Sequence, residues 1–279
     1  MPPQLPALEA CDVFIRSLQG CLIKSLIEVL KDVIFEATII VTDGLLKITT
    51  MDSSKSSLIY LKLDAANFEQ FVCRRPQRLG VSMINLFKII KMASHKQDIL
   101  SLFVQKDTPY ELGVVIENEE KRSQTVFHLA LLDLDSQDIR IPEFHYRSIL
   151  TLPSSMFHRL CRDMHQLGSF VTMETHNGCL TLSCKGDFAK QATTFSPADD
   201  DKENVSIVTS SDEDGDSGGV IRGTFSLKYL CLFGRTATLS QMVTIYLKED
   251  HPLLLEYNIG SLGKLIFLLT PLVGVDTDE

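Results

Sequence analysis

The chain has 279 residues, of which 44% are apolar and 23% charged, a balance typical of a soluble folded protein with one large or two ordinary domains. No basic segment followed by an apolar stretch opens the sequence, and no run approaches about eighteen apolar residues, so we expect an intracellular, soluble protein. Seven cysteines without CxxC pairs favour reduced thiols over a disulfide framework or a zinc site.

The formal net charge of −9 argues against a nucleic-acid partner, because binding to phosphates requires cations. Eight of the acids, however, lie between Asp199 and Asp216, where Lys202 is the only base. We interpret this Asp-, Ser- and Gly-rich stretch as a disordered surface loop, and the rest of the chain is almost balanced. Ser210 and Ser211 each precede an acid by three residues and are candidate sites for acidic-directed kinases; solubilising sequence is the alternative.

Hydrophobic periodicity indicates helices and strands that alternate along the chain. Helical spacing of apolar residues predicts helices near Gln19 to Ile34, Ser82 to Ala93, Ser154 to Leu167 and Ser226 to Phe233. Gly234 is expected just past the end of the last helix as its C′ residue. Alternating or β-branched segments predict strands within 35–63 and at 99–105, 111–116, 125–132, 170–175, 179–184, 242–248, 253–259 and 265–270.

The stretch Leu129 to Arg147 interrupts this pattern, with an acidic centre and with Pro142, which disfavours helix at the preceding residue. We interpret it as a connector, because a helix, strands, a second helix and further strands occur in that order on each side of it. The sequence therefore predicts an α+β protein of two similar tandem domains. Their expected bounds are 1–130 and 148–279, joined by a connector at 131–147, with the acidic loop at 197–219.

Each of the four expected helices carries bases on its polar side. These are Lys24 and Lys31, Lys88 and Lys91, Arg159 and Arg162, and Lys228 with Arg235 just past the helix end. For any single helix, a solvated basic face is the alternative interpretation. Four such faces in an acidic chain favour a positive surface that follows a phosphate backbone without reading bases.

Short motifs between Phe14 and Pro271 resemble a known family when they are taken together. They are Leu30-Lys31-Asp32, Met51-Asp52-Ser53-Ser54, Lys88-Ile89-Ile90-Lys91, Leu132-Asp133-Leu134-Asp135 with Ile141-Pro142-Glu143, Cys161-Arg162-Asp163, and Pro252-Leu253-Leu254-Leu255-Glu256-Tyr257. Each is weak alone, but in this order and spacing they resemble the proliferating cell nuclear antigen family of sliding DNA clamps.

The resemblance implies a head-to-tail homotrimeric ring, with sheets outside and helices lining a central channel around duplex DNA. The eight helix bases would contact the DNA, and the connector would be the interdomain connecting loop. Beside that loop, members of the family bind short partner motifs in a hydrophobic groove. For each apolar residue assigned to this groove, ordinary core packing is the alternative interpretation. The implied groove residues are Met51, Leu58, Leu131, Leu132, Pro252, Leu268, Thr270 and Pro271.

The implied function is that of a non-enzymatic processivity factor in DNA replication and repair, in the nucleus or a viral replication compartment. Its implied partners are double-stranded DNA, DNA polymerase and other proteins with the interacting motif, and an ATP-dependent clamp loader, with no cofactor, metal or membrane. The alternative is one subunit of a heterotrimeric checkpoint-type or specialised clamp. The chain departs from the family pattern at Ser25, Gln166, Ser56 and Leu268, and no lysine near His176 matches the family's ubiquitin acceptor.

Enzymatic interpretations find little support in the sequence. Gly215-Asp216-Ser217-Gly218-Gly219 matches the nucleophile motif of chymotrypsin-like proteases, but it lies in the charged stretch and no Ala-Ala-His-Cys segment precedes it. Asp133 and Asp135 are expected to be too exposed for acid–base catalysis. There is no GxxxxGK[ST] or HExxH motif.

Overall fold

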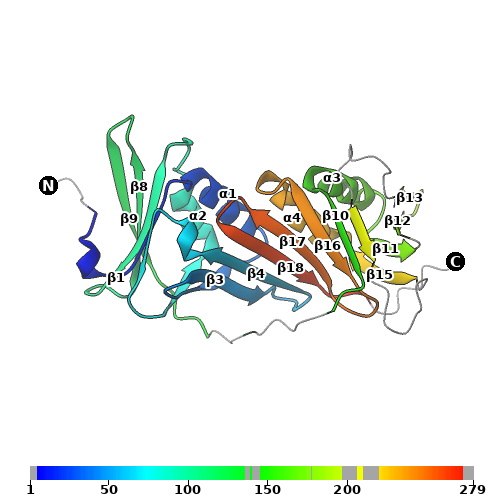
Figure 1. Ribbon diagram of the computed structural model, residues 1–279, viewed down its shortest axis with the longest axis horizontal. Helices are drawn as coiled ribbons and strands as arrows, with labels where there is room; N and C mark the ends of the chain where they lie inside the picture. Colours follow the sequence, from blue (N-terminus) through cyan, green and yellow to red (C-terminus); the bar gives the residue numbers. More distant parts are fainter. Residues whose placement is uncertain are drawn as a thin grey trace. The chain divides into compact units, whose positions relative to one another are not determined.

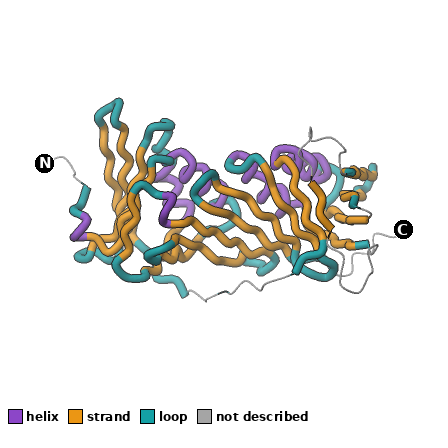
Figure 2. The backbone as a smooth tube through the Cα atoms, viewed as in Figure 1, coloured by secondary structure: helices purple, strands orange, loops and turns teal. Residues whose placement is uncertain are grey.

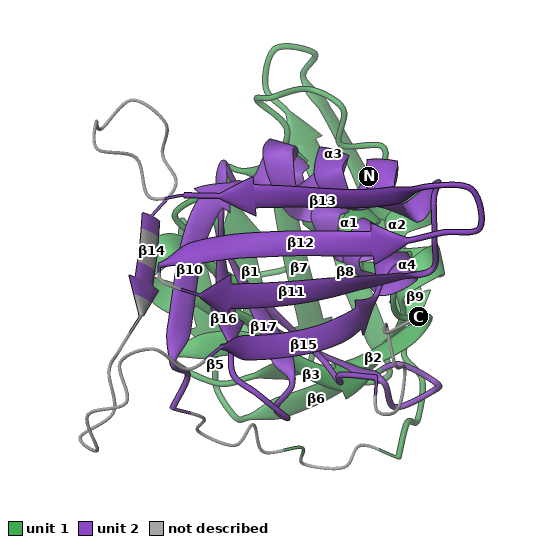
Figure 3. Cartoon of the chain, turned by 90° about the vertical axis from the view of Figure 1, so that its right-hand side faces the viewer, with its two compact units in different colours: residues 1–51, 59–139, 259–265 green, residues 52–58, 140–258, 266–279 purple. Residues whose placement is uncertain are grey.

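The computed structural model describes residues 5–135, 139, 145–176, 178–196, 206–209 and 220–272. The chain divides into two compact units (Figure 3). Unit 1 comprises residues 1–51, 59–139 and 259–265, and unit 2 comprises residues 52–58, 140–258 and 266–279. Each unit thus includes one short segment from the other half of the sequence, and the expected bounds at 130 and 147 stay a prediction.

Four α-helices lie where the periodicity predicts them (Figure 1). They are α1 (Gly20–Leu30), α2 (Met83–Ile90), α3 (Ser154–His165) and α4 (Leu227–Gly234). The Ser82 hydroxyl caps α2 by accepting a hydrogen bond from the backbone amide of Asn85. The first helix ends four residues earlier than expected, because the amides of Asp32 and Val33 bond to carbonyls three residues back and tighten the last turn.

The order of elements repeats along the chain: a strand, a helix, five strands, a second helix and three strands, in both halves of the described residues. The strands of the first half are β1 (Cys11–Ser17), β2 (Glu36–Val41), β3 (Leu45–Met51), β4 (Ser57–Asp64), β5 (Gln70–Cys73), β6 (Gln77–Ser82), β7 (Ile99–Gln105), β8 (Glu111–Asn118) and β9 (Ser123–Ala130). Those of the second half are β10 (Ser148–Pro153), β11 (Phe170–His176), β12 (Cys179–Lys185), β13 (Lys190–Phe195), β14 (Ser206–Thr209), β15 (Ile221–Ser226), β16 (Met242–Leu247), β17 (Leu253–Ile259) and β18 (Gly263–Leu269).

Strand pairing repeats in the same way. In the first half of the chain, β5-β1-β7-β8-β9 form an antiparallel sheet, and β6, β2, β3 and β4 are successive neighbours in a second. In the second half, β14, β10, β16, β17 and β18 are the counterparts of the first set, and the four-stranded sheet β13-β12-β11-β15 is the counterpart of the second (Figure 3). The expectation of two similar α+β domains with antiparallel sheets is therefore confirmed.

Several strands have no counterpart among the sequence expectations, namely β1, β5, β6, β10, β13, β14 and β15. The strand β14 lies inside the stretch expected to be disordered, where β-branched Ile207, Val208 and Thr209 pair with β10. For these four residues the expectation of disorder is wrong. The rest of the acidic stretch, 197–205 and 210–219, lies outside the described residues.

Each unit packs two helices together beside its strands, α1 with α2 and α3 with α4 (Figure 2). The apolar side of each helix is buried: Leu26, Leu30 and Leu86 in unit 1, and Phe157 and Phe233 in unit 2, are at most 1% exposed. In unit 2 the ring of Phe233 stacks on Phe267 with centroids 4.2 Å apart. This burial fixes which sides of the helices face solvent.

Candidate nucleic-acid and partner interfaces

The solvent-facing side of the helix pair in unit 1 carries the predicted bases. Lys88 and Lys91 are exposed and Lys24 is half-buried, whereas Leu86 and Ile90 on the other side of α2 are buried. The ammonium of Lys88 donates to the side-chain oxygen of Asn85 one turn earlier, 3.2 Å away. The amphipathic pattern of these helices therefore does place their lysines toward solvent.

Lys31 differs from the other seven predicted DNA contacts. It is the C-cap residue of α1, and its ammonium lies 2.7 Å from the carboxylate of Asp32 and 4.8 Å from the ring centroid of Phe87 in α2. Its side chain is 22% exposed. Part of its charge is thus balanced within the protein, and the cation–π contact links the two helices.

All four predicted bases of unit 2, Arg159, Arg162, Lys228 and Arg235, are exposed. Burial lowers the pKa of His158 in α3, and the guanidinium groups of Arg162 and Arg235 lower it further. The same two guanidinium groups act on Cys231 in α4. Arg162 and Arg235 therefore share one electropositive region, although they come from different parts of the sequence.

Gly234 does not end α4 as a left-handed C′ residue, so that expectation is wrong. Its φ is −60°, and the chain continues into a 3-10 turn at Arg235–Thr238. A Cβ atom on Gly234 would lie 2.8 Å from the imidazole of His158. The glycine therefore permits close contact between α3 and α4 rather than reversal of the chain, and this contact brings Arg235 toward α3.

The predicted groove residues fall in both units, three in unit 1 and five in unit 2. In unit 1, Met51 is exposed, and Leu131 and Leu132 are half-buried. In unit 2, Leu58 and Leu268 are 9% and 6% exposed. The remaining three are half-buried or exposed: Pro252, Thr270 and Pro271. Leu58 and Leu268 thus contribute chiefly to the core, and the other six offer more surface.

The connector is described at its two ends, and residues 136–138 and 140–144 lie outside the description. At the first end, the Leu132 amide donates to the carbonyl of Gly80, 2.8 Å away. At the second end, the phenol of Tyr146 donates to the carbonyl of Pro252 over 3.1 Å, and burial raises its pKa to about 12. Sequence reasoning missed both attachments, since nothing near Gly80 or Tyr146 indicates its distant partner.

A polar network around Asp52 is a further feature that the sequence did not reveal. Its carboxylate accepts hydrogen bonds from the Ser54 hydroxyl, the Ser57 amide and the phenol of Tyr229 in α4. Burial alone would raise the pKa of Asp52, but these bonds outweigh it and hold the pKa at about 2. The motif Met51-Asp52-Ser53-Ser54 could have suggested a local turn, but not the bond to Tyr229.

The residues considered for metal or catalytic chemistry give no metal site in the described part of the chain. There, no group of three or more His, Cys, Asp or Glu side chains is arranged to hold a metal ion. Asp133 and Asp135 are exposed. The Ser217 motif lies outside the described residues. Within the described residues, none of the helices is long and apolar enough to cross a membrane.

The fold and the charge distribution define a class of protein: a tandem of two α+β domains, each with paired helices whose exposed sides are basic. Two family domains match the chain, the C-terminal domain of proliferating cell nuclear antigen over residues 140–272 and its N-terminal domain over residues 14–139. The chain belongs to the proliferating cell nuclear antigen family, as its motifs indicated.

Two relatives illustrate how far the similarity extends. A probable DNA polymerase sliding clamp 1 of Paramecium bursaria Chlorella virus 1 is 34% identical over 263 residues, which cover 93% of this chain and 96% of the relative. The proliferating cell nuclear antigen of Chaetomium thermophilum is 32% identical over 262 residues, covering 94% and 98%. The similarity thus spans both domains.

Proposed function

We propose that this protein is a DNA sliding clamp, a processivity factor that encircles duplex DNA and tethers DNA polymerase and other replication and repair proteins. The observation that carries the proposal is the repeated helix pair with a basic exposed side, within a chain of the proliferating cell nuclear antigen family. Six of the eight predicted bases are exposed, Lys24 is half-buried, and Lys31 forms an ion pair with Asp32.

Cations at these positions suit non-specific binding. Phosphates lie at regular intervals along the duplex, so a row of Lys and Arg side chains attracts any sequence equally. A closed ring needs little affinity, because topology keeps the protein on DNA while weak contacts allow it to slide. The eight proposed contacts are Lys24, Lys31, Lys88, Lys91, Arg159, Arg162, Lys228 and Arg235.

We propose a head-to-tail homotrimer, and the internal repeat supports this. In the repeat, β9 corresponds to β18, and β13 corresponds to β4. Hydrogen bonds join the ends of β4 and β18, from the Asp64 amide to the carbonyl of Leu262 and from the Thr270 amide to that of Ser56. Strands β9 and β13 are edges of their sheets, and pairing of β9 with β13 of the next subunit would repeat this arrangement and cover both edges.

The residues of the proposed partner groove differ in exposure: Met51 and Thr270 are exposed, Leu131, Leu132, Pro252 and Pro271 are half-buried, and Leu58 and Leu268 are buried or nearly so. Peptides with aromatic anchors bind such apolar surfaces. We propose that polymerase and other motif-carrying proteins bind here. The clamp itself is non-catalytic, a separate ATP-dependent loader opens it, and it acts in the nucleus or at viral replication sites.

The DNA proposal is tested by reversing four bases together: Lys31→Glu, Lys91→Glu, Arg162→Glu and Arg235→Glu. The matched control reverses four lysines outside the helices, at Lys47, Lys96, Lys121 and Lys248. The readout is stimulation of a polymerase on primed circular DNA with a clamp loader. We expect the helix variant to lose stimulation and the control to keep it. Full stimulation by the helix variant, with its trimer intact, would refute the proposal.

Oligomeric state separates the homotrimer from its alternative, a subunit of a heterotrimeric clamp. One chain has a mass of 31.2 kDa, so a closed homotrimer has about 94 kDa. Light scattering after gel filtration, at several concentrations, measures this mass. A stable trimer is expected, and a persistent monomer would favour the heteromeric alternative.

A further inference from the structure

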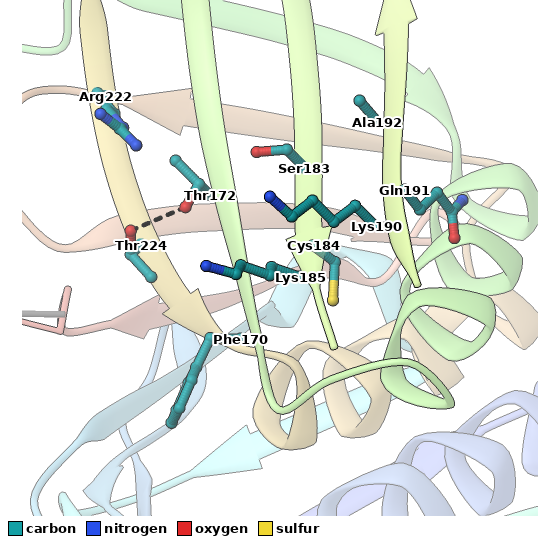
Figure 4. Close-up of a pocket in the computed structure, with 10 residues that line it drawn as sticks. All are labelled: Phe170, Thr172, Ser183, Cys184, Lys185, Lys190, Gln191, Ala192, Arg222 and Thr224. Carbon is teal, nitrogen blue, oxygen red and sulfur yellow. Dashed lines mark hydrogen bonds between the residues drawn. The ribbon is translucent and has the colours of Figure 1, made fainter. Parts of the chain in front are cut away.

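A cavity of about 460 Å³ opens on the four-stranded sheet of unit 2, and none of the proposed DNA or groove contacts is among its lining residues. It lies on the face that carries Thr172 and Ser183 (Figure 4). Val171 and Met173, which alternate with Thr172 along β11, are buried. Three cations line it, Lys185 from β12, Lys190 from β13 and Arg222 from β15, and Glu174 of β11 is directly opposite Arg222 in the strand register. On an acidic protein, this is a local concentration of positive charge.

The strand register explains how the cations come together. Lys185 and Lys190 are directly opposite each other on β12 and β13. Their side chains lie side by side and extend across the sheet toward Thr172 and Thr224, whose hydroxyl oxygens are 3.0 Å apart (Figure 4). Like charges directly opposite each other destabilise a sheet. An anion bound between the two ammonium groups would offset this cost.

The cavity also offers neutral groups suited to an oxyanion. The hydroxyls of Ser183 and Thr224 are half-buried beside the cations, and the ring of Phe170 is 41% exposed at the edge. Carboxylate and phosphoryl oxygens accept hydrogen bonds from ammonium, guanidinium and hydroxyl groups alike. The Phe170 ring would give an apolar contact to neighbouring aliphatic side chains.

We propose that this cavity binds an acidic peptide segment of a partner protein, through carboxylate or phosphoryl oxygens held by Lys185, Lys190 and Arg222. A bounded cavity with three cations matches a short cluster of charges better than a long phosphate backbone, which calls for an extended positive stripe. The site uses side chains on one face of the sheet and leaves the backbone edge of β13 for pairing between subunits. It does not depend on DNA binding by the helices.

The experiment must distinguish binding of a partner's acidic segment from binding of the acidic residues of this chain. Residues 199–216 carry eight acids and lie in sequence between β13 and β15, the two edge strands of this sheet. A tethered acidic segment competes at an effective concentration that a free peptide rarely reaches. The test therefore uses the wild-type chain and a neutralised chain, in which these eight acids are changed to Asn and Gln.

The probe is a fluorescent dodecapeptide of Asp and Glu, with an Asn/Gln peptide of the same length as the neutral control, measured by anisotropy at low salt. We expect both chains to bind the acidic peptide only. Lys185→Gln with Lys190→Gln should weaken binding about fivefold, as expected for two exposed ion pairs. The matched control, Lys55→Gln with Lys248→Gln, removes the same charge from unit 2 outside the cavity and should bind normally.

Three results would overturn the proposal. The first is that the acidic peptide binds the cavity variant as tightly as it binds the matched control, or that it binds neither the wild-type nor the neutralised chain. The second is binding by the neutralised chain alone, which would assign the cavity to the chain's own acids. The third is binding of a single-stranded DNA dodecamer more than tenfold tighter than the peptide and lost in the cavity variant, which would assign it to nucleic acid.

Discussion

The phenol of Tyr229 in α4 donates a hydrogen bond to Oδ2 of Asp52 over 2.7 Å, although the two residues are 177 positions apart. The Ser54 hydroxyl lies 2.8 Å from the same phenol, and the Ser57 amide donates to Asp52 Oδ1 over 2.7 Å. The segment that leads into Leu58 is thereby attached to the helix that carries Lys228. The same hydrogen bonds thus hold the segment before Leu58, a proposed groove residue, and the helix of Lys228, a proposed DNA contact.

Removal of the Tyr229 hydroxyl tests this support. We expect Tyr229→Phe to lower the free energy of unfolding by about 1.5 kcal/mol, the lower end for a hydrogen bond to a charged group. Urea denaturation measures the change. Tyr246→Phe, which removes the same hydroxyl from β16, is the matched control and should cost less than about 0.5 kcal/mol. Equal effects of the two variants would contradict the expectation.

Asp52 predicts a specific acid sensitivity. Its pKa in the folded protein is about 2, below the ordinary 3.8, so the carboxylate stabilises the fold above pH 3.8. That contribution declines as the pH falls toward 2. Asp52→Asn should therefore reduce stability at pH 7 and flatten the loss of stability between pH 4 and 2. Thermal unfolding at a series of pH values measures this, and parallel curves for both proteins would refute it.

Gly80 positions the first end of the connector. A Cβ atom there would lie 2.1 Å from the carbonyl oxygen of Leu132, so Gly80→Ala must displace the backbone that carries two proposed groove residues. We expect a loss of about 1–3 kcal/mol in unfolding free energy and weaker binding of a partner-motif peptide. Gly44→Ala is the control, because a Cβ atom at Gly44 meets nothing within 4 Å. Unchanged peptide binding by Gly80→Ala would contradict the assignment.

Lys31 and Lys91 should behave differently although both are in the proposed DNA set. Lys91→Ala should lower the slope of log affinity against log salt by about 1, as expected for one lost phosphate contact. Lys31→Ala should change the slope less, because Asp32 and Phe87 already hold its ammonium, and should cost about 0.5–1 kcal/mol of stability. DNA titrations at several salt concentrations, together with urea denaturation, distinguish the two; equal slope changes would contradict the expectation.

The cysteines should differ in reactivity according to burial. Cys11, Cys161 and Cys184 are buried, and burial raises the pKa of each thiol. Burial also raises the pKa of half-buried Cys73 and Cys231, so access of the reagent to the sulfur separates the two groups. Native protein at pH 8 should therefore be alkylated only at the half-buried cysteines. These are Cys21, Cys73, Cys179 and Cys231. Mass spectrometry after brief iodoacetamide treatment tests this, with urea-unfolded protein as the control in which all seven should react.

Much of the fold was predictable, because local patterns carry it. The apolar spacing in α1 to α4 and the alternation in β2 to β4 report directly which side of each element is buried. The strands that were missed, such as β13 and β15, are short or polar, and their pairing partners supply what their own sequences lack. The eight helix bases were predictable for the same reason as the helices, since an amphipathic pattern identifies its solvent side.

The sequence by itself thus determined the tandem repeat, the four helices with their basic sides, and the family. The tertiary structure decided which distant groups meet: Tyr229 with Asp52, Tyr146 with Pro252, and Lys185 with Lys190 and Arg222. It also decided that Lys31 forms an ion pair with Asp32 and a cation–π contact with Phe87, and that Gly234 allows α3 and α4 to pack closely. Periodicity is a property of neighbouring residues, whereas these contacts depend on strand register and helix packing, which no local pattern encodes.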